Sequence, residues 1–567
     1  MNKIISNIIK YIASNKYIRN LPSKIKMASD KIIISKNYLG QKGYSIYKKN
    51  MSLAEQNSLR ESLMVAPFMP KSPVKPVPYP IFLESADKIY IPRFFGIDAF
   101  GIPPSTKITH GAPINIQFAG ELRDYQNKII DAYMDYVKKM NDKSNQGGGG
   151  LLDIPCGRGK TVMALKILAK LGRKTLIIVH KEFLLNQWVE RAQQFLPDAK
   201  IGAIKGKIID VEGKDIVIGM LQSLSMKEYP QELFKDFGLL IVDECHHISA
   251  EIFVRSLQKI VPFYTLGLSA TMNRKDGLTK VFKMFLGEII YKEKRDNSDD
   301  VLVKTLKYQN SDEEFGEEER DYRGNLKYST MISKLCSFSY RTEFIISVIE
   351  KELEIKSEQQ ILLLAHNKNI LTYIFKAIEH RQITSVGYYI GGMKEKDLNI
   401  SATKQLIVAT YSMAAEALDI KSLSTLILAS PKTDIVQAVG RILRVKQEQP
   451  LVIDILDQHD VFKKQYLKRR AYYIQNKYKI IETTNTLYLS QDKDKDKDKD
   501  KDKDKDKIYT TIFDPALHVK LPRANTKKKD TKGRSIELDI ETELESEPIL
   551  EIDDDEPIKK HVCLIDI

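Results

Sequence analysis

The chain has 567 residues, of which 43% are hydrophobic and 29% are charged, and its formal net charge is +14. This composition is typical of a folded globular protein, and roughly 100–200 residues per domain predict about three domains with tails rather than one core. Four scattered cysteines without a CxxC pair exclude a disulfide framework or zinc knuckle, and no apolar run reaches the roughly 18–20 residues needed to cross a bilayer.

The charge balance gives a first indication of a partner. Lys and Arg outnumber Asp and Glu by 89 to 75, which favours a polyanion such as nucleic acid. An AT-rich genome also produces chains rich in Lys, Ile, Asn and Tyr, so charge alone supports this partner only weakly. The cysteine usage predicts an intracellular, reducing compartment and no secretion. The lack of a long apolar run predicts no membrane partner.

Residues 1–115 are predicted to form a basic arm, a proline-rich linker and a small module. The first fifty residues carry many lysines and a single acid, Asp30, so a solvated arm is favoured over a transit peptide. The stretch PFMPKSPVKPVPYPIF (67–82) is typical of an extended linker. The segment KIYIPRFFGIDAFG (88–101) alternates apolar and polar residues, which predicts a short strand and turn.

Residues 116–295 show the pattern of a parallel sheet covered by helices. A helix begins near residue 122, and a glycine hinge at residues 147–150 precedes an apolar strand at 151–154 and a helix after Lys160. Strand and helix patterns then alternate through TLIIVH, EFLLNQWVERAQQF, DIVIGM, LLIVDE and YTLGLSAT. Such alternation is typical of a parallel sheet with helices on its faces.

A second alternating block follows an acidic interruption. The stretch DEEFGEEER (312–320) leads us to assign residues 296–335 to a polar connector. The segments ILLLAHN, ITSVGYYI, QLIVAT, TLILAS and LVIDIL then predict a second α/β unit over residues 336–487. The predicted fold class is therefore α/β, with two tandem parallel sheets covered by helices.

Residues 488–567 lack this alternation and are predicted to form a disordered C-terminal tail. Residues 492–507 are a pure Asp-Lys alternation, which cannot bury a core and predicts a spacer. A basic patch, KKKDTKGR (527–534), and an acidic run between residues 537 and 556 follow. Blocks of opposite charge this close together favour a solvated tail over a docking site.

The segment LLDIPCGRGKTVMAL (151–165) has the order strand, glycine turn, Gly-Lys-Thr and helix. This order lets backbone N–H groups and a helix N-terminus bind phosphates, while Lys160 reaches the β and γ oxygens and the Thr161 hydroxyl binds Mg²⁺. Ile154 stands where the strict pattern has its first glycine, so a chance Gly-Lys-Thr is the competing interpretation. The predicted nucleotide-binding residues are Pro155, Cys156, Gly157, Arg158, Gly159, Lys160 and Thr161.

The segment LLIVDECHH (239–247) is an apolar strand that ends in two adjacent carboxylates. Asp243 is placed to hold Mg²⁺ and Glu244 to orient and deprotonate the attacking water, because open α/β sheets bind ligands at the carboxyl ends of their strands. An ordinary strand-end Asp-Glu pair is the alternative. We expect His246 to couple nucleotide to nucleic acid rather than to bind zinc.

Further elements in the same order give the chain a family resemblance. LRDYQ (122–126) precedes the phosphate segment, LGLSATMNRKDGL (266–278) follows the carboxylates, and LIVATYSMAAEALDI (406–420) and QAVGRILR (437–444) lie in the second block. With these elements the chain resembles a superfamily 2 helicase of the DExH kind over residues 120–460. The resemblance implies that 116–295 and 336–487 are RecA-like domains, the first binding ATP.

The resemblance also implies roles for individual residues. Gln126 would read adenine, and Ser269 and Thr271 would couple ATP hydrolysis to movement on nucleic acid. In the second domain, Asp419 and Gln437 would contact the nucleotide. Ala417 stands where this family usually has glycine, which puts the close backbone approach there in doubt.

Two arginines of QAVGRILR are predicted to act as arginine fingers. Arg441 and Arg444 are three residues apart on one helix face, from which they can supply positive charge to the γ-phosphate. Surface arginines on a helix would be the alternative if this motif stood alone.

Within the superfamily, the segments at 180–188, 274–276 and 431–441 resemble the branch that contains XPB, phage UvsW and the poxviral transcript-release helicases. KIYIPRFFG and LGLSATMNRKDGLTKVF are similar to segments of helicases from large nucleo-cytoplasmic DNA viruses, including giant viruses. The resemblance implies an ATP- and Mg²⁺-dependent helicase that moves 3′ to 5′ on DNA or DNA–RNA hybrids in viral transcription, replication or repair. It also implies transcription or replication proteins as partners, in the cytoplasm, nucleus, virion or viral factory.

Three alternatives stay open at this point. The first is an RNA helicase with the same fold. The second is a nucleic-acid-binding scaffold without turnover, which the intact Lys160, Asp243 and Glu244 disfavour. The third is the translocating subunit of a restriction-like nuclease, although the remaining segments show no convincing cluster of nuclease carboxylates and lysine.

Overall fold

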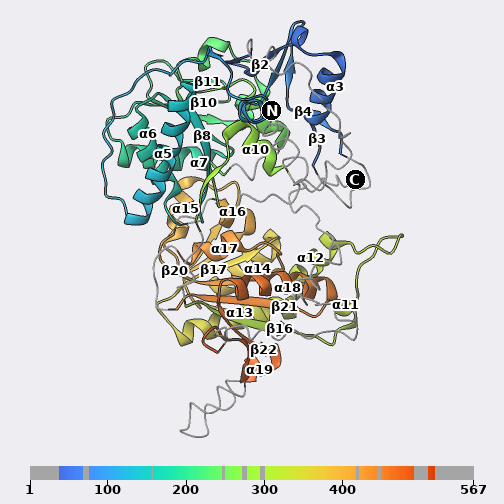
Figure 1. Ribbon diagram of the computed structural model, residues 1–567. Helices are drawn as coiled ribbons and strands as arrows, with labels where there is room; N and C mark the ends of the chain where they lie inside the picture. The colour runs from blue at the N-terminus through green and yellow to red at the C-terminus, as the bar shows by residue number, and fades with distance from the viewer. Residues whose placement is uncertain are drawn as a thin grey trace, which may run out of the picture. The chain divides into compact units, whose positions relative to one another are not determined.

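The structure is a computed structural model, and it describes residues 37–67, 76–155, 157–244, 250–270, 278–293, 300–416, 420–443, 449–490 and 508–517. The chain divides into two compact units, Met1–Asp296 and Asn297–Ile567, which are described separately below (Figure 1). Each contains a largely parallel sheet covered by helices, so the predicted α/β fold class is confirmed. In the part of the chain described, no helix is both long and apolar enough to cross a membrane.

The first unit is built on an eight-stranded sheet of order β11-β10-β12-β9-β13-β14-β8-β15, parallel except for the β10–β11 pair. The strands are β8 (Gly148–Asp153), β9 (Thr175–Val179), β10 (Ile201–Lys205), β11 (Ile208–Ile209), β12 (Ile216–Met220), β13 (Leu239–Val242), β14 (Tyr264–Ser269) and β15 (Ile289–Lys292). The helices are α5 (Asp124–Ser144), α6 (Lys160–Leu171), α7 (Glu182–Phe195), α8 (Leu221–Met226), α9 (Ala250–Leu257) and α10 (Thr279–Leu286).

The strands of this sheet are apolar because both of its faces are covered. Along β9, Ile177 packs in a cluster with residues of α5, α6 and α7, whereas Leu176 and Ile178 pack in a cluster with residues of α8, α9 and α10. Successive strand residues point to opposite faces, so a continuous apolar run fills both layers. The carboxyl ends of the parallel strands therefore share one edge of the sheet, where polar residues can gather.

The glycines predicted to form a hinge are instead part of a strand. Gly148 begins β8, and Gly149 and Gly150 are buried between β14 and β15. A Cβ at Gly149 would lie 1.7 Å from the Thr265 side chain, and one at Gly150 would lie 2.4 Å from Ile290. The glycines thus permit close packing of neighbouring side chains, a tertiary constraint that overrides their weak strand preference.

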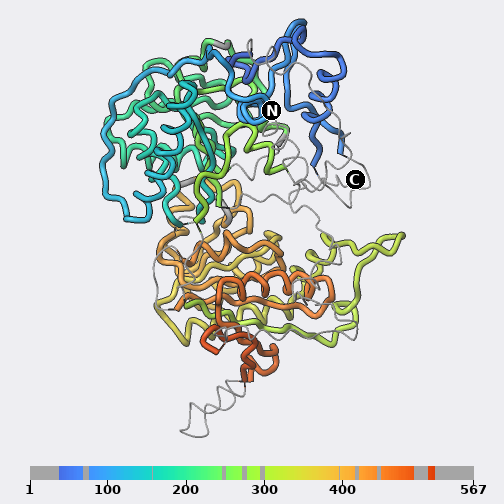
Figure 2. The backbone as a smooth tube through the Cα atoms, viewed as in Figure 1, coloured from blue at the N-terminus to red at the C-terminus, as the bar shows by residue number. Residues whose placement is uncertain are grey.

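An N-terminal module packs on the first sheet within the same unit. Its five-stranded sheet has the order β5-β6-β2-β1-β7, and a separate β3–β4 pair accompanies it. The elements are β1 (Tyr38–Gly40), β2 (Gly43–Tyr47), α3 (Leu53–Ser62), β3 (Met64–Val65), β4 (Tyr79–Pro80), β5 (Leu83–Glu84), β6 (Lys88–Ile91), α4 (Arg93–Phe100) and β7 (Ser105–Thr106). Tyr44 and Ile89 share an apolar cluster with Val281 and Met284 of α10. Figure 2 shows this blue segment lying beside the green segment that contains α10.

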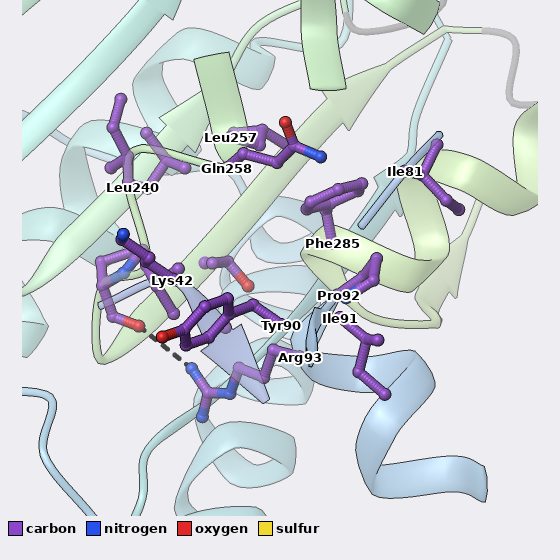
Figure 3. Close-up of a pocket in the computed structure, with 15 residues that line it drawn as sticks. Lys42, Ile81, Tyr90, Ile91, Pro92, Arg93, Leu240, Leu257, Gln258 and Phe285 are labelled. Carbon is purple, nitrogen blue, oxygen red and sulfur yellow. Dashed lines mark hydrogen bonds between the residues drawn. The ribbon is translucent and has the colours of Figure 1, made fainter. Parts of the chain in front are cut away.

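Arg93 ties the module to the first sheet. Its side chain is buried and donates to the carbonyls of Pro262 and Phe263 at 3.0 Å and to that of Gln146 at 2.5 Å. Figure 3 shows this guanidinium bonded to a carbonyl, next to the ring of Tyr90. One cation thus satisfies three buried carbonyls that lie just before β8 and β14.

The second unit contains an eight-stranded sheet of order β18-β19-β17-β20-β21-β16-β22-β23, parallel except for the terminal β22–β23 pair. Its strands are β16 (Leu302–Tyr308), β17 (Gln360–Ala365), β18 (Val386–Tyr389), β19 (Leu406–Thr410), β20 (Leu423–Leu428), β21 (Leu451–Asp457), β22 (Lys479–Thr484) and β23 (Thr510–Phe513). Its helices are α11 (Glu313–Gly316), α12 (Tyr328–Ser337), α13 (Ser339–Ile355), α14 (Lys368–His380), α15 (Glu395–Ala402), α16 (Tyr411–Glu416), α17 (Val436–Arg441), α18 (Asp460–Gln475) and α19 (Asn485–Ser490).

Two strands lie where the sequence suggested no regular structure. Residues 302–308, within the range assigned to the connector, form β16 between β21 and β22, and their alternating burial suits a sheet position. Within the tail predicted to be disordered, residues 510–513 form β23 on the edge of β22. Both strands are stabilised by partners distant in sequence, so local composition did not reveal them. The Asp-Lys spacer lies outside the described residues.

Candidate active site

The turn between β8 and α6 has the backbone shape of a phosphate-binding loop. Gly157 and Gly159 adopt φ angles of 81° and 80°, in the left-handed region that favours glycine. A Cβ at Gly159 would also lie 2.5 Å from the side-chain nitrogen of Gln126. Helix α6 begins at Lys160, so the N-terminal N–H groups of a twelve-residue helix lie at this turn.

Lys160 and Glu244 meet at the carboxyl edge of the first sheet. The Lys160 Nζ lies 2.9 Å from Glu244 Oε1, and the two side chains are 10% and 17% exposed. Glu244 follows β13 and has a φ of 45°, an unusual conformation for a residue other than glycine. The fold therefore holds this carboxylate in a strained position beside the lysine, as occurs at functional sites.

Asp243 is more deeply buried than Glu244 and is held by two donors. The indole N–H of Trp188 donates to Asp243 Oδ2 at 2.8 Å, and the backbone N–H of Glu244 donates to Oδ1 at 3.0 Å. Burial and then the negative charge of Glu244 raise the pKa of Asp243 to about 6, while Lys160 and the Trp188 hydrogen bond oppose this shift. The Asp243 carboxylate is therefore fixed in orientation, and a nearby cation would stabilise its charged form.

Trp188 is a site residue that the sequence did not identify. It is the only tryptophan of the chain, it lies on α7, and it is 1% exposed. Its segment contributed to the family resemblance, but an aromatic residue on the apolar face of a helix is normally read as core. One general rule could have pointed to Trp188, because a buried indole N–H usually finds a hydrogen-bond acceptor.

Gln126 holds the phosphate turn from α5. Its side chain donates to the carbonyl of Arg158 at 3.1 Å and accepts from the backbone N–H of Arg123 at 3.0 Å. Tyr125 also donates to the Arg158 carbonyl, at 3.2 Å, and its ring lies 3.9 Å from the Arg158 guanidinium. Arg158 in turn donates from Nε to Glu293 at 3.0 Å. The contacts of Gln126 place it against the turn, and its predicted reading of adenine stays a prediction.

The predicted coupling and second-domain residues are only partly within the described residues. Ser269 is buried at the end of β14, where its carbonyl accepts from the backbone N–H of Ile154 at 2.9 Å and joins this strand end to the phosphate turn. Gln437 and Arg441 lie on α17 in the second unit, and Arg441 is buried. The remaining predicted residues, Cys156, His246, Thr271, Asp419 and Arg444, lie outside the described residues.

The first unit thus brings Lys160, Asp243, Glu244 and Thr161 to one edge of a sheet. Within the residues described, no three His, Cys, Asp or Glu side chains are grouped so that they could hold a metal. Asp243 is nevertheless a suitable ligand for Mg²⁺, which commonly takes one or two protein carboxylates together with phosphate oxygens. Such an arrangement is chemically suited to phosphoryl transfer.

Comparison with known proteins places this site in a family. Residues 119–274 match the family model described as Type III restriction enzyme, res subunit. The chain is 36% identical over 460 residues to the ATP-dependent RNA helicase L396 of Acanthamoeba polyphaga mimivirus, covering 77% of this chain and 85% of that protein. It is 26% identical over 381 residues to helicase 161L of invertebrate iridescent virus 6, covering 64% and 82%.

Among solved structures, the helicase domain of Hef from Pyrococcus furiosus aligns with a TM-score of 0.41 at 14% identity, over 62% of this chain and 98% of that one. The family assignment depends instead on the mimivirus relative, whose 36% identity extends over 85% of its own length. The chain belongs to the superfamily 2 helicases of large DNA viruses and is an ATP-hydrolysing enzyme.

Proposed function

We propose that this helicase hydrolyses ATP at the edge of the first sheet that carries Lys160, Asp243 and Glu244. The observation that carries the proposal is the convergence of these three side chains, with Lys160 Nζ 2.9 Å from Glu244 Oε1 and Asp243 adjacent. ATP supplies the phosphoanhydride bond, and the protein positions and stabilises charge, as is usual in phosphoryl transfer.

The residues present fit ATP and Mg²⁺. The turn at Gly157 and Gly159 leaves backbone N–H groups unhindered by side chains, and a Cβ at Gly159 would collide with Gln126. Asp243 and the hydroxyl of Thr161 would hold Mg²⁺, and Asp243 already carries a raised pKa that a cation would lower.

Each catalytic side chain then has one task. Lys160 neutralises negative charge on the β and γ oxygens, for which it must exchange its contact with Glu244 for contacts with phosphate. Glu244 orients the attacking water and accepts its proton. Trp188 fixes the orientation of the Asp243 carboxylate, which would hold Mg²⁺.

The second unit supplies positive charge to the γ-phosphate in this proposal. Arg441 and Arg444 are the predicted arginine fingers, and Asp419 and Gln437 are predicted to contact the nucleotide. What supports this is their order in the family motifs and the position of Arg441 on α17. Arg441→Ala should lower the rate of ATP hydrolysis about a thousandfold or more while leaving ATP binding nearly unchanged.

For the polymer, we propose movement in the 3′ to 5′ direction on DNA or DNA–RNA hybrids during viral transcription, replication or repair. The resemblance to the branch with XPB and UvsW supports this substrate. RNA is a second candidate, because the mimivirus relative carries the name of an RNA helicase. In either case, binding to the nucleic acid should be largely independent of its sequence and strongly dependent on salt concentration, since phosphate contacts dominate such binding.

The test is ATP hydrolysis and strand displacement measured across single-stranded DNA, duplex DNA, DNA–RNA hybrid, single-stranded RNA and duplex RNA. Lys160→Ala serves as the control for contaminating ATPases. Stimulation by DNA and by hybrid, with unwinding from 3′ overhangs, is the expected result. Stimulation by RNA alone would favour the second candidate.

The same panel separates the remaining alternatives. A scaffold would bind nucleic acid without turnover on any substrate, which would contradict the catalytic proposal. A nuclease would shorten labelled DNA in the presence of Mg²⁺ and ATP, and we expect the DNA to stay intact.

A further inference from the structure

The loop between β20 and α17 leads directly into the helix that carries Arg441. In the first part of this loop, the carbonyls point to side chains rather than to other backbone groups. Four consecutive carbonyls, those of residues 429–432, each accept a hydrogen bond from a side chain of another element. We call these residues the carbonyl loop. Hydrogen bonds from four side chains restrict the motion of these four residues.

The two ends of the carbonyl loop are held by two buried arginines. Arg341 of α13 donates from Nη1 to the carbonyl of Ala429 at 2.8 Å. Arg469 of α18 donates from Nη1 to the carbonyl of Lys432 at 3.0 Å. The side chains of these arginines are 0% and 1% exposed, respectively. Both are therefore committed to interactions within the second unit.

Each arginine is itself fixed by a carboxylate of β21. Arg341 donates to both oxygens of Asp457, at 2.5 and 2.9 Å, and Arg469 donates to both oxygens of Asp454, at 2.8 Å each. The two aspartates are three residues apart on a strand, so they point to opposite faces of the sheet. The carbonyl loop is thus held from both sheet faces, by α13 and by α18.

Two tyrosines complete the set. Tyr411 donates to the carbonyl of Ser430 at 2.6 Å, and Tyr328 reaches that of Pro431 at 3.5 Å. The Ser430 hydroxyl also lies 2.7 Å from His366 Nδ1 and accepts from the His366 backbone N–H at 3.0 Å.

Buried ion pairs are a poor means of stabilising a fold, because desolvation of both charges offsets most of their attraction. Compared with an apolar core, the two ion pairs add a fixed orientation of the arginine side chains. A guanidinium bound bidentately to a carboxylate has its remaining N–H groups aimed along fixed lines. Here those lines end on the carbonyls of Ala429 and Lys432, which lie twelve and nine residues before Arg441.

We propose that Arg341 and Arg469 are positioning residues for ATP hydrolysis. By holding the carbonyl loop, they set the place of α17 and so the approach of Arg441 to the γ-phosphate. This inference rests on the proposed role of Arg441. Small displacements of catalytic groups are costly, and a shift of about 1 Å can lower a rate by about a hundredfold.

The test compares Arg469→Lys with Tyr473→Phe in the full chain. Lysine keeps the positive charge beside Asp454 but cannot bind both carboxylate oxygens and the Lys432 carbonyl in the same geometry. Tyr473 also donates to Asp454, at 2.9 Å, but bonds no carbonyl of the loop, so Tyr473→Phe perturbs the same ion pair and serves as the matched control. We expect Arg469→Lys to lower the kcat for nucleic-acid-stimulated ATP hydrolysis about tenfold or more at a nearly unchanged KM for ATP. The control should stay within about twofold of the parent.

A second comparison in an Arg441→Ala background separates positioning from general destabilisation. If Arg469 acts through Arg441, the effect of Arg469→Lys on kcat should vanish there, because coupled substitutions are not additive. Equal kcat losses in Arg469→Lys and Tyr473→Phe, or an undiminished loss in the Arg441→Ala background, would overturn the inference. A fully active Arg441→Ala would instead contradict the proposed arginine finger.

Tyr411→Phe decides the matter if Arg469→Lys does not fold. It removes only the hydroxyl that donates to the Ser430 carbonyl. A lower kcat with an unchanged KM, abolished in the Arg441→Ala background, would support the role of the carbonyl loop. An unchanged kcat would overturn it.

Discussion

Acid–base pairs in the two units differ in their access to solvent. Lys160 and Glu244 of the first unit are partly exposed at a sheet edge, whereas Arg341 with Asp457 and Arg469 with Asp454 of the second are almost completely buried. An accessible pair can exchange its partner for a phosphate or a water molecule. A completely buried pair cannot exchange its partner in this way, so its role is structural. Ion pairs of opposite charge thus suit exchange with a ligand at the edge of one sheet and a structural role inside the other unit.

The largest effect is expected from Lys160→Ala, which removes the exchangeable cation. ATP turnover should fall about a thousandfold or more, since charge stabilisation is usually the largest contribution to phosphoryl transfer. Nucleic-acid binding, measured by fluorescence anisotropy, should be largely unchanged. Normal turnover in this variant would remove the central assignment of the site.

Glu244→Gln keeps the size and shape of the side chain beside Lys160 and removes the carboxylate that is proposed to act as the base. We expect a loss of turnover of about a hundredfold to ten-thousandfold, which is the usual contribution of a general base. ATP should still bind, and a stable ATP complex should accumulate in single-turnover experiments. Rapid hydrolysis by this variant would assign the base to another residue.

Trp188→Phe tests whether the indole hydrogen bond orients Asp243. Its expected effect is smaller than that of the two changes above. Loss of a hydrogen bond to a charged group costs about 1.5–3 kcal/mol, so the Mg²⁺ concentration for half-maximal ATPase activity should rise about tenfold or more. Phe183→Leu, on the same helix and partly buried in the same apolar cluster, is the control for lost packing. An equal Mg²⁺ requirement in both variants would show that the indole contributes packing alone.

The smallest effect expected near neutral pH comes from the titration of Asp243. Because burial and Glu244 raise its pKa to about 6, the carboxylate becomes protonated and loses its affinity for Mg²⁺ as pH falls through about 6. Apparent Mg²⁺ affinity should fall about twofold at pH 6 and about tenfold at pH 5 relative to pH 8. Trp188 fluorescence can follow the titration.

A variant sharpens this pH experiment. In Glu244→Gln the like charge beside Asp243 is absent, so the midpoint of the Mg²⁺ titration should move to lower pH. A midpoint that does not move, or Mg²⁺ affinity independent of pH between 8 and 5, would show that Asp243 does not control Mg²⁺ binding.

How well the sequence predicts these features depends on how far apart the interacting residues lie along the chain. The phosphate turn around Lys160 and the strand end at Asp243 each have a local pattern, so both could be recognised directly. Trp188 lies 55 residues from Asp243, and Arg341 lies 116 residues from Asp457. No local pattern marks such partners, because burial and pairing arise only when the chain folds. The glycines of β8 show the same limit, since their neighbours are set by packing between strands.

The short strand β23 has a further consequence for the second unit. Residues 510–513 pair antiparallel with β22, and Asp514 forms an ion pair with Lys479 at 2.9 Å. Without β23, the N–H and C=O groups along this side of β22 would be open to a strand from another molecule. A chain that ends before residue 508 should therefore self-associate more readily as its concentration rises than the full chain does.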